Sequence, residues 1–173
     1  MCAVLPEYDE AAALAFYEDK ARTGLIELKS SLNRNFGLYA GEELGLWIKG
    51  QPVWMNADGI VPVPMHWTKR LRRGYNQAEI IAKGISSVTG IPVMKKCIIK
   101  KYSRTAQHKL GAKERAENVY SFIPAGRDLE GMRLIICDDI ITTGSTMSRC
   151  AEILKKCGAE AVYAAAAATT RRK

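Results

Sequence analysis

Residues 134–146 read Leu134-Ile-Ile-Cys-Asp-Asp-Ile-Ile-Thr-Thr-Gly-Ser-Thr146. Four apolar residues lead to two adjacent carboxylates, and two further apolar residues lead to a turn rich in hydroxyl groups and glycine. The next residues, 147–156, have apolar side chains at helical spacing. This order predicts a buried strand over Arg133–Asp139, a loop, and a helix over Ser145–Lys156 that ends at Gly158. In an open α/β sheet, such a junction lies at the carboxyl edge of the strands, where ligands bind.

The loop after the strand is suited to a phosphate group. A helix N-terminus presents free backbone N–H groups and the positive end of the helix dipole, which together favour an anion by about 0.3–1 kcal/mol. Gly144 lets the backbone approach a phosphate closely, and the hydroxyl groups of Thr142, Thr143, Ser145 and Thr146 add donors. The sequence therefore predicts an anion site at residues 142–146.

The two carboxylates, Asp138 and Asp139, require a different partner. They would repel a phosphate beside them, and they suit the hydroxyl groups of a ribose diol or a cation. A ligand with a phosphate at one end and a sugar diol in the middle satisfies both halves of the segment. The alternative interpretation is that one aspartate caps a helix and that the loop is an ordinary turn. The chain contains neither a G-x-x-x-x-G-K-[ST] loop nor a G-x-G-x-x-G motif.

Residues 134–147 resemble the motif with which type I phosphoribosyltransferases bind phosphoribosyl pyrophosphate (PRPP). The resemblance implies that Asp138 and Asp139 hold the 2′ and 3′ hydroxyl groups of PRPP and that residues 142–146 surround its 5-phosphate. The enzymes that salvage 6-oxopurines have an aspartate general base at the position of Thr142. The threonine argues against hypoxanthine or guanine as the acceptor.

Four other segments resemble the competence protein F (ComF) family, in the order that the family shows. They are Phe16-Tyr-Glu with Leu25-Ile-Glu-Leu-Lys29, Gly59-Ile-Val-Pro-Val-Pro64, Lys69-Arg-Leu-Arg-Arg-Gly-Tyr-Asn-Gln-Ala78, and the segment from Gln107 to Asn118. Members of the family usually begin with a four-cysteine zinc module. This chain has no C-x-x-C, so zinc binding is not predicted. Cys2 fits the last ligand of a module that was removed, and an equal alternative is that the chain never had such a module.

The resemblance implies a reaction in which pyrophosphate is displaced from C1 of PRPP with inversion, assisted by Mg²⁺. Asp138 or Asp139 is the expected protein contact to the metal, directly or through water. Pyrophosphate is expected at Pro64, Met65, His66, Arg72 and Arg73. A flexible hood over the reacting centre is expected to contain Arg104, Gln107, Lys109 and Arg115. The sequence does not identify the acceptor.

A second hypothesis comes from a different functional class. The association of the family with natural competence suggests a non-catalytic adapter in DNA uptake that keeps the PRPP site and binds single-stranded DNA or a helicase partner. The basic segment at residues 95–118 has eight Lys and Arg residues against two Glu, within a net charge of +8. Such clusters indicate polyanionic ligands, which include both PRPP and nucleic acid, or a solvated basic face.

Length and composition predict a single domain of 173 residues whose 47% apolar content is enough for a core. We divide it into an N-terminal helical segment, residues 1–50, that packs on a phosphoribosyltransferase-like core, residues 51–173. No apolar run is long enough to insert into a membrane. Five cysteines without motif spacing indicate reduced thiols and a cytoplasmic protein.

The periodicity of the chain predicts an α/β fold of the type I phosphoribosyltransferase class, in which a mainly parallel sheet carries helices on both faces. Helices are expected at Glu18–Leu32, Leu38–Ile48, Ala112–Val119 and from a cap at Asn76 to Ser87. Strands are expected at Ile60–Val63, Ile91–Ile99 and, despite its helix-favouring alanines, Ala161–Thr170. Gln77 and Glu79, just inside a helix, are interpreted as structural.

Overall fold

The computed structural model describes residues 6–30, 33–102 and 120–171. Its main sheet contains four strands, β1 (Glu10–Phe16), β2 (Gly59–Pro62), β5 (Arg133–Ile141) and β6 (Ala161–Thr169), in the order β1-β6-β5-β2. Every neighbouring pair in this sheet is parallel. Two more strands, β3 (Ile98–Tyr102) and β4 (Tyr120–Pro124), form an antiparallel hairpin. The predicted α/β class with a parallel sheet is confirmed.

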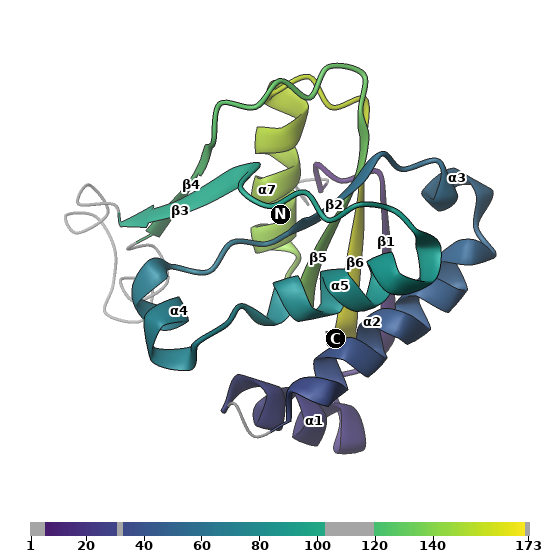
Figure 1. The fold of residues 1–173 in the computed structure, drawn as a ribbon, viewed down its shortest axis with the longest axis vertical. Helices are drawn as coiled ribbons and strands as arrows, with labels where there is room; N and C mark the ends of the chain where they lie inside the picture. The colour runs from purple at the N-terminus through teal and green to yellow at the C-terminus, as the bar shows by residue number, and fades with distance from the viewer. Residues whose placement is uncertain (1–5, 31–32, 103–119, 172–173) are drawn as a thin grey trace.

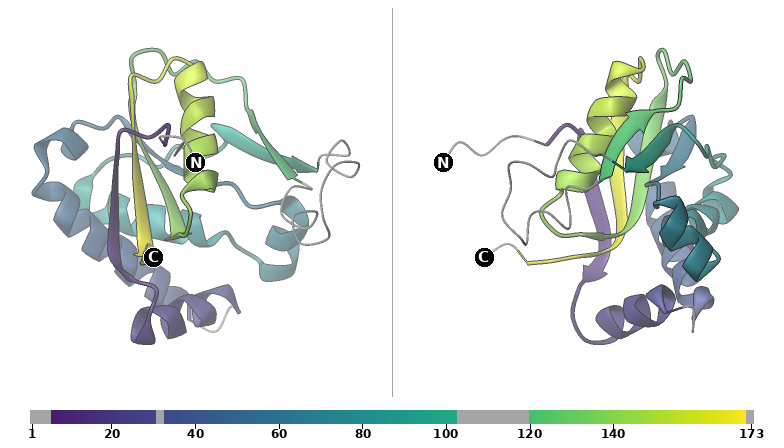
Figure 2. Two further views of the ribbon diagram at one scale, coloured as in Figure 1. Left: turned by 180° about the vertical axis from the view of Figure 1, so that it is seen from behind. Right: turned by 90° about the vertical axis from the view of Figure 1, so that its left-hand side faces the viewer.

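Helices cover both faces of the main sheet (Figures 1 and 2). One face carries α2 (Arg34–Lys49) and α5 (Gln77–Thr89), with α1 (Asp19–Lys29) packed against α2 and the short α3 (Pro52–Met55) after it. The other face carries α7 (Ser145–Lys156) together with the β3–β4 hairpin. Helix α4 (Trp67–Arg73) is short and has no buried residue.

Strand β5 divides the apolar core into two halves because its side chains alternate between the faces. Ile135 and Cys137 join the half beneath α2 and α5, whereas Leu134 and Ile136 join the half beneath α7. All four residues are fully buried. A strand that is apolar on both faces is the expected sequence of a central parallel strand.

The alanine-rich segment near the C-terminus is strand β6, as predicted. Ala164 and Ala166 face α7, whereas Ala165 and Ala168 face the α2–α5 layer. The helix propensity of alanine amounts to less than about 1 kcal/mol per residue. Pairing with β1 on one side and β5 on the other outweighs it, because both edges of β6 receive a hydrogen-bonded neighbour.

Helices α2 and α5 cross at very short range, and glycines make this possible. A Cβ atom on Gly41 would lie 2.2 Å from the carbonyl oxygen of Ile81, and one on Gly84 would lie 2.4 Å from that of Leu38. No side chain fits at such distances, so the backbones of the two helices are in direct contact. This contact fixes the position of α5, whose N-terminus reaches the functional edge of the sheet.

Several boundaries differ from the expectations. The N-terminal segment contributes strand β1 in addition to its helices, and this strand was not predicted. The strand expected at Ile91–Ile99 is wrong over most of its length: only an isolated bridge from Val93 to Ile60 forms before β3 begins at Ile98. Pro92 lacks an N–H donor, and Lys96 has a φ of 60°, so the chain turns between these points.

Three other elements can be compared with their predicted bounds. Strand β5 continues to Ile141, two residues beyond the predicted end at Asp139, so the acidic pair lies within the strand and not at its last two positions. Helix α2 begins at Arg34 because the Asn33 side chain accepts a hydrogen bond from the Phe36 N–H. Helix α7 has the predicted bounds. The helix expected at Ala112–Val119 lies outside the described residues. No helix in the described ranges combines the length and apolar composition that crossing a bilayer requires.

Candidate functional site

A pocket of about 360 Å³ lies at the carboxyl ends of β2 and β5; we call it the edge pocket. Seven of the residues predicted for the site line it together, namely Pro64, Met65, His66, Arg73, Asp138, Asp139 and Thr146. A larger, open hollow of about 650 Å³ is lined by residues between Asp19 and Phe36, and it contains none of the predicted residues. The chemistry expected from the sequence therefore converges in the edge pocket.

The acidic pair is held by contacts on both members. The backbone N–H of Asp139 donates to Asp138 Oδ1 at 2.9 Å, and Lys29 Nζ forms an ion pair with Asp139 Oδ2 at 2.9 Å. Burial, and then repulsion from Asp139, raises the pKa of Asp138 to about 8, against the opposing effect of the Asp139 N–H, Lys29 and Lys100.

The residues predicted to bind a phosphate, 142–146, lead into the N-terminus of α7, which begins at Ser145. Gly144 adopts a left-handed conformation with φ of 79°, and no side chain caps the helix. This conformation favours glycine, and a Cβ atom here would also lie 2.8 Å from the hydroxyl oxygen of Tyr8, whose side chain would have to shift. Thr143 Oγ1 and Ser145 Oγ lie 2.9 Å apart. Thr146 reaches the edge pocket, whereas Thr142, Thr143 and Ser145 are exposed beside it.

The expected pyrophosphate segment follows β2. The N–H of Val63 donates to the carbonyl of Cys137 at 2.9 Å, which continues the pairing with β5 up to the turn at Pro64. His66 is 5% exposed, and its Nδ1 lies 2.7 Å from Thr68 Oγ1. The two arginines predicted together are the last residues of α4, and their side chains have different surroundings. Arg73 lines the edge pocket, whereas Arg72 is exposed and does not line it.

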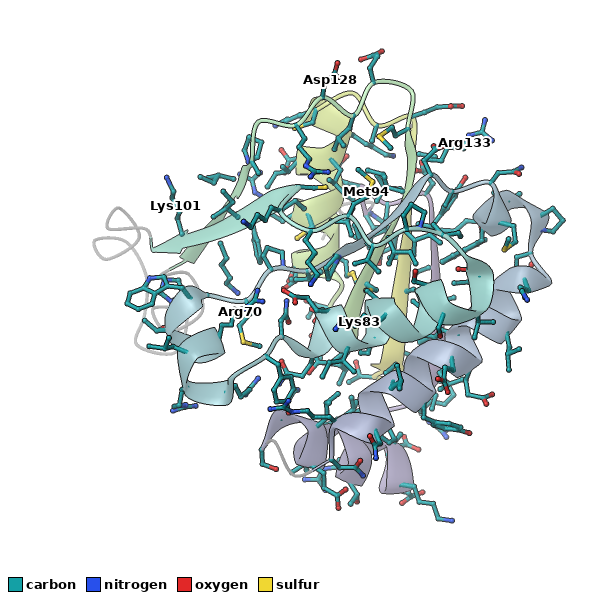
Figure 3. All side chains as sticks on the ribbon, viewed as in Figure 1. Arg70, Lys83, Met94, Lys101, Asp128 and Arg133 are labelled. Atoms are coloured by element: carbon teal, nitrogen blue, oxygen red, sulfur yellow. The ribbon has the colours of Figure 1, made fainter. Side chains whose placement is uncertain are left out.

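Arg70 lies on α4, where Figure 3 labels it. It forms two hydrogen bonds with the carboxylate of Glu79, at 2.6 and 3.3 Å. Lys95 forms an ion pair with the same carboxylate at 3.5 Å. Glu79 thus links α4 to α5 and to the segment before β3, which agrees with its interpretation as structural.

Six residues that line the pocket were not predicted as site residues, namely Lys29, Val63, Lys69, Asn76, Gln77 and Lys100. All of them except Lys100 lie in segments that resembled the ComF family, which was the available signal, but none was assigned to the site. Lys100 comes from β3 and lies 4.7 Å from the centre of the Phe122 ring. Burial, and then repulsion from Lys69, lowers the pKa of Lys100, and Asp138 opposes this shift.

The residues present fit a magnesium ion shared with a ligand. Asp138 and Asp139 offer carboxylate oxygens at the pocket, and Mg²⁺ in nucleotide sites commonly takes one or two carboxylates and completes its shell with phosphate oxygens and water. Within the described residues, no group of three or more His, Cys, Asp or Glu side chains is arranged to hold a metal by itself. The acidic pair thus suits a metal that arrives with its ligand.

The remaining sequence-based expectations fall elsewhere. Arg104, Gln107, Lys109 and Arg115, expected in the hood, lie outside the described residues, as does Cys2. Cys137 is fully buried, and burial together with Asp138 raises its pKa well above the usual value, so it is not a nucleophile. Trp54 is a core residue, stacked on Tyr163 with ring centres 5.2 Å apart.

Comparisons with known proteins agree with this geometry. A family model described as the phosphoribosyl transferase domain matches residues 71–173, which is more than half of the chain. Competence protein F of Haemophilus influenzae is 34% identical over 109 residues, covering 61% of this chain and 47% of that protein. The DNA utilization protein YhgH of Escherichia coli K12 is 30% identical over 105 residues, covering 61% and 46%. The chain spans about half the length of the curated relatives it matches.

Among solved structures, a hypothetical protein from Neisseria gonorrhoeae with bound ppGpp aligns with a TM-score of 0.50 and 14% identity. The alignment covers 76% of this chain and 66% of that one, and at this identity it speaks for the fold alone. Together with the family match over residues 71–173, the parallel sheet and the loop at the N-terminus of α7 assign the chain to a family. The chain belongs to the phosphoribosyl transferase domain family, and the curated proteins it resembles include competence protein F, DNA utilization protein YhgH and competence protein ComFC.

Proposed function

We propose that this protein binds PRPP and transfers its ribose 5-phosphate group to an acceptor, with release of pyrophosphate. One observation carries the proposal: a single pocket joins Thr146 of the phosphate loop, the acidic pair, and the turn after β2 with Arg73. These three parts suit the 5-phosphate, the ribose diol and the pyrophosphate of PRPP, respectively. An ordinary turn after β5 would not require the other two parts beside it.

The acidic pair has the role of holding the ribose. Carboxylates accept hydrogen bonds from the 2′ and 3′ hydroxyl groups, and two adjacent carboxylates match a vicinal diol. The ion pair with Lys29 partly neutralises Asp139, which reduces the repulsion between the acidic pair and a polyanionic ligand.

In the reaction, the bond between C1 and a pyrophosphate oxygen breaks while the acceptor bonds to C1 from the opposite face and loses its proton. Positive charge develops on the ribose ring, and the nearby carboxylates stabilise it. Negative charge develops on the departing pyrophosphate, and Lys69, Arg73 and Lys100 line the pocket where it would accumulate. Mg²⁺, when bound with PRPP, would neutralise part of that same charge.

Calorimetry with PRPP and Mg²⁺ tests this proposal. The wild type is expected to bind, and a variant carrying both Asp138→Asn and Asp139→Asn is expected to lose most of its affinity because the diol loses its charged acceptors. Asp128→Asn, an exposed aspartate on the β4–β5 connection, is the matched control and should bind as the wild type does (Figure 3). Equal affinity in the wild type and the double variant would refute the proposal.

A second candidate function is the non-catalytic adapter for DNA uptake, and one observation favours it. Helix α4 exposes Trp67 and Leu71, with 66% and 80% of their surface accessible, on a helix that also carries Arg72. An exposed aromatic ring beside cationic side chains is a typical platform for single-stranded nucleic acid. Lys101 extends outward from β3 and adds positive charge to the neighbouring hairpin (Figure 3). The names of two relatives refer to competence and to DNA utilization.

Two measurements separate the candidates. The adapter would bind PRPP without releasing pyrophosphate for any of a broad panel of amine, base and phosphate acceptors, and it would bind oligonucleotides with an affinity that falls with salt. Trp67→Ala should weaken oligonucleotide binding and leave PRPP affinity unchanged, because Trp67 does not line the edge pocket. Pyrophosphate release with an acceptor would support the enzyme.

A further inference from the structure

Gln77 has an unusual environment for a polar side chain. It is the first residue of α5, it is 3% exposed, and it contributes to the wall of the edge pocket. Its Nε2 is buried and has no hydrogen-bond partner among the described residues, and it is the one such side-chain atom in that part of the chain. Buried amide groups in folded proteins are nearly always paired, so an unpaired donor at a pocket wall indicates a ligand that pairs with it.

The backbone around Gln77 is fixed by its neighbours in sequence. Asn76 Nδ2 donates to the carbonyl of Val63 at 2.9 Å, and Asn76 Oδ1 accepts from the Ala78 N–H at 3.2 Å. The Cys137 thiol donates to the carbonyl of Ala78 at 3.3 Å. The start of α5 is therefore attached to the ends of β2 and β5. These contacts fix the backbone from which the Gln77 side chain reaches the pocket wall.

The chemistry of the wall identifies the part of the ligand that Gln77 would bind. Lys69 and Arg73 line the pocket from α4, and both side chains are hydrogen-bond donors. The Gln77 amide N–H₂ adds a neutral donor to the same wall. The hydroxyl groups of ribose need acceptors, which Asp138 and Asp139 supply. The non-bridging oxygens of pyrophosphate only accept hydrogen bonds, so they match the unpaired donor.

We propose that Gln77 Nε2 donates a hydrogen bond to a non-bridging pyrophosphate oxygen and so acts as a specificity residue for the pyrophosphate end of the ligand. This inference rests on the proposed function. It changes the interpretation of Gln77 from a structural residue to a ligand-binding one. It also gives a hydrogen-bond partner to a buried donor that has none among the described residues.

The test compares inorganic pyrophosphate with Mg²⁺ and ribose 5-phosphate as separate calorimetric probes. Gln77→Met removes the amide and keeps a long, unbranched side chain, whereas Gln77→Glu keeps the size and replaces the donor by a carboxyl group. Gln51→Met is the matched control, because Gln51 lies before α3 and does not line the edge pocket. Thermal unfolding without ligand is recorded for each variant.

Gln77→Met is expected to weaken pyrophosphate binding about tenfold or more, the effect of losing one hydrogen bond to a charged oxygen. Ribose 5-phosphate affinity should stay within about twofold, a shift small beside that tenfold loss. The melting temperature without ligand should be maintained or raised, because the substitution removes an unpaired buried donor. Gln77→Glu should weaken pyrophosphate binding further as pH rises and the carboxyl group ionises.

Three results would overturn the assignment. Pyrophosphate affinity equal to that of the wild type in both variants would exclude Gln77 as a contact and leave the proposed function intact. A lower melting temperature with equal weakening of both probes would show a structural role. Failure of the wild type to bind either probe would overturn the proposed function together with this assignment.

Discussion

Lys29 Nζ lies 2.9 Å from Asp139 Oδ2, which links the last turn of α1 to the acidic pair of β5 across 110 residues of sequence. The Asp139 side chain is 13% exposed and that of Lys29 is 36% exposed, so the pair sits at the mouth of the edge pocket. The lysine occupies the position from which a cation would neutralise Asp139. In this form of the protein, a cation and a ribose diol must both compete with Lys29 for that carboxylate.

Replacement of Lys29 is therefore expected to strengthen the binding of Mg²⁺ in the absence of PRPP. Lys29→Met should raise this affinity by up to about fivefold, which corresponds to the ~1 kcal/mol at most that a partly exposed ion pair contributes. Calorimetric titration with magnesium chloride measures the change. Lys20→Met, an exposed lysine on the same helix and away from the edge pocket, is the control. A lower Mg²⁺ affinity in Lys29→Met would show that Lys29 does not compete with the metal.

The two arginines at the end of α4 should differ in their effects. Arg73→Ala is expected to weaken pyrophosphate binding by about tenfold, because a guanidinium group in the pocket wall is lost. Arg72→Ala is the matched control on the next residue, and it should bind pyrophosphate almost as the wild type does because Arg72 is exposed outside the pocket. Ribose 5-phosphate affinity should be kept in both variants. Equal losses in Arg72→Ala and Arg73→Ala would argue against direct contact.

Asp138 gives the protein a distinctive dependence of stability on pH. Its pKa rises from 3.8 to about 8 on folding, so the folded state holds the proton more tightly than the unfolded chain. The resulting stabilisation is fully present below about pH 4 and is lost as pH rises towards 8. In a metal-free buffer, the free energy of unfolding should therefore decline over this range by roughly 1–4 kcal/mol on account of this group.

Urea unfolding of Asp138→Asn across the same pH range checks this expectation, because the variant should lack that part of the decline. Asp9→Asn provides a contrast of opposite sign. Burial alone would raise the pKa of Asp9, but hydrogen bonds from Lys155 and the Val162 N–H lower it. Its contribution to stability is therefore lost as pH falls, and Asp9→Asn should keep the decline that Asp138 causes. Identical pH profiles for the wild type and Asp138→Asn would contradict the role given to Asp138.

The crossing of α2 and α5 provides a test of the scaffold. Gly41→Ala places a methyl group 2.2 Å from the Ile81 carbonyl oxygen, so the two helices must move apart. The expected loss of unfolding free energy is about 1–3 kcal/mol or more, measured by chemical denaturation. Gly50→Ala is the control, because the nearest atom to its new methyl group lies at an ordinary distance of 3.4 Å. An unchanged stability in Gly41→Ala would show that the helices do not pack this closely.

The local signals of the sequence predicted the elements whose residues are contiguous. Helix α7 and the turn before it follow from a single stretch, and the helix has the predicted bounds. The Asn76 cap of α5 was also predicted, and the structure confirms it. The Asn76 side chain accepts a hydrogen bond from the N–H of Ala78, two residues later. Strand β1 was missed because its alanine-rich sequence has no strong strand preference, and pairing with β6 decides its conformation.

The sequence by itself determined the α/β class, the acidic pair and the hydroxyl-rich turn before α7, since each depends on residues next to one another in the chain. Only the tertiary structure decided that Lys29 pairs with Asp139, that Arg73 and not Arg72 lines the pocket, and that Gln77 is buried there without a partner. These side chains come from α1, α4 and α5, whose relative positions depend on long-range packing such as the α2–α5 contact. No local pattern contains that information, because it is the meeting of distant segments that creates the site.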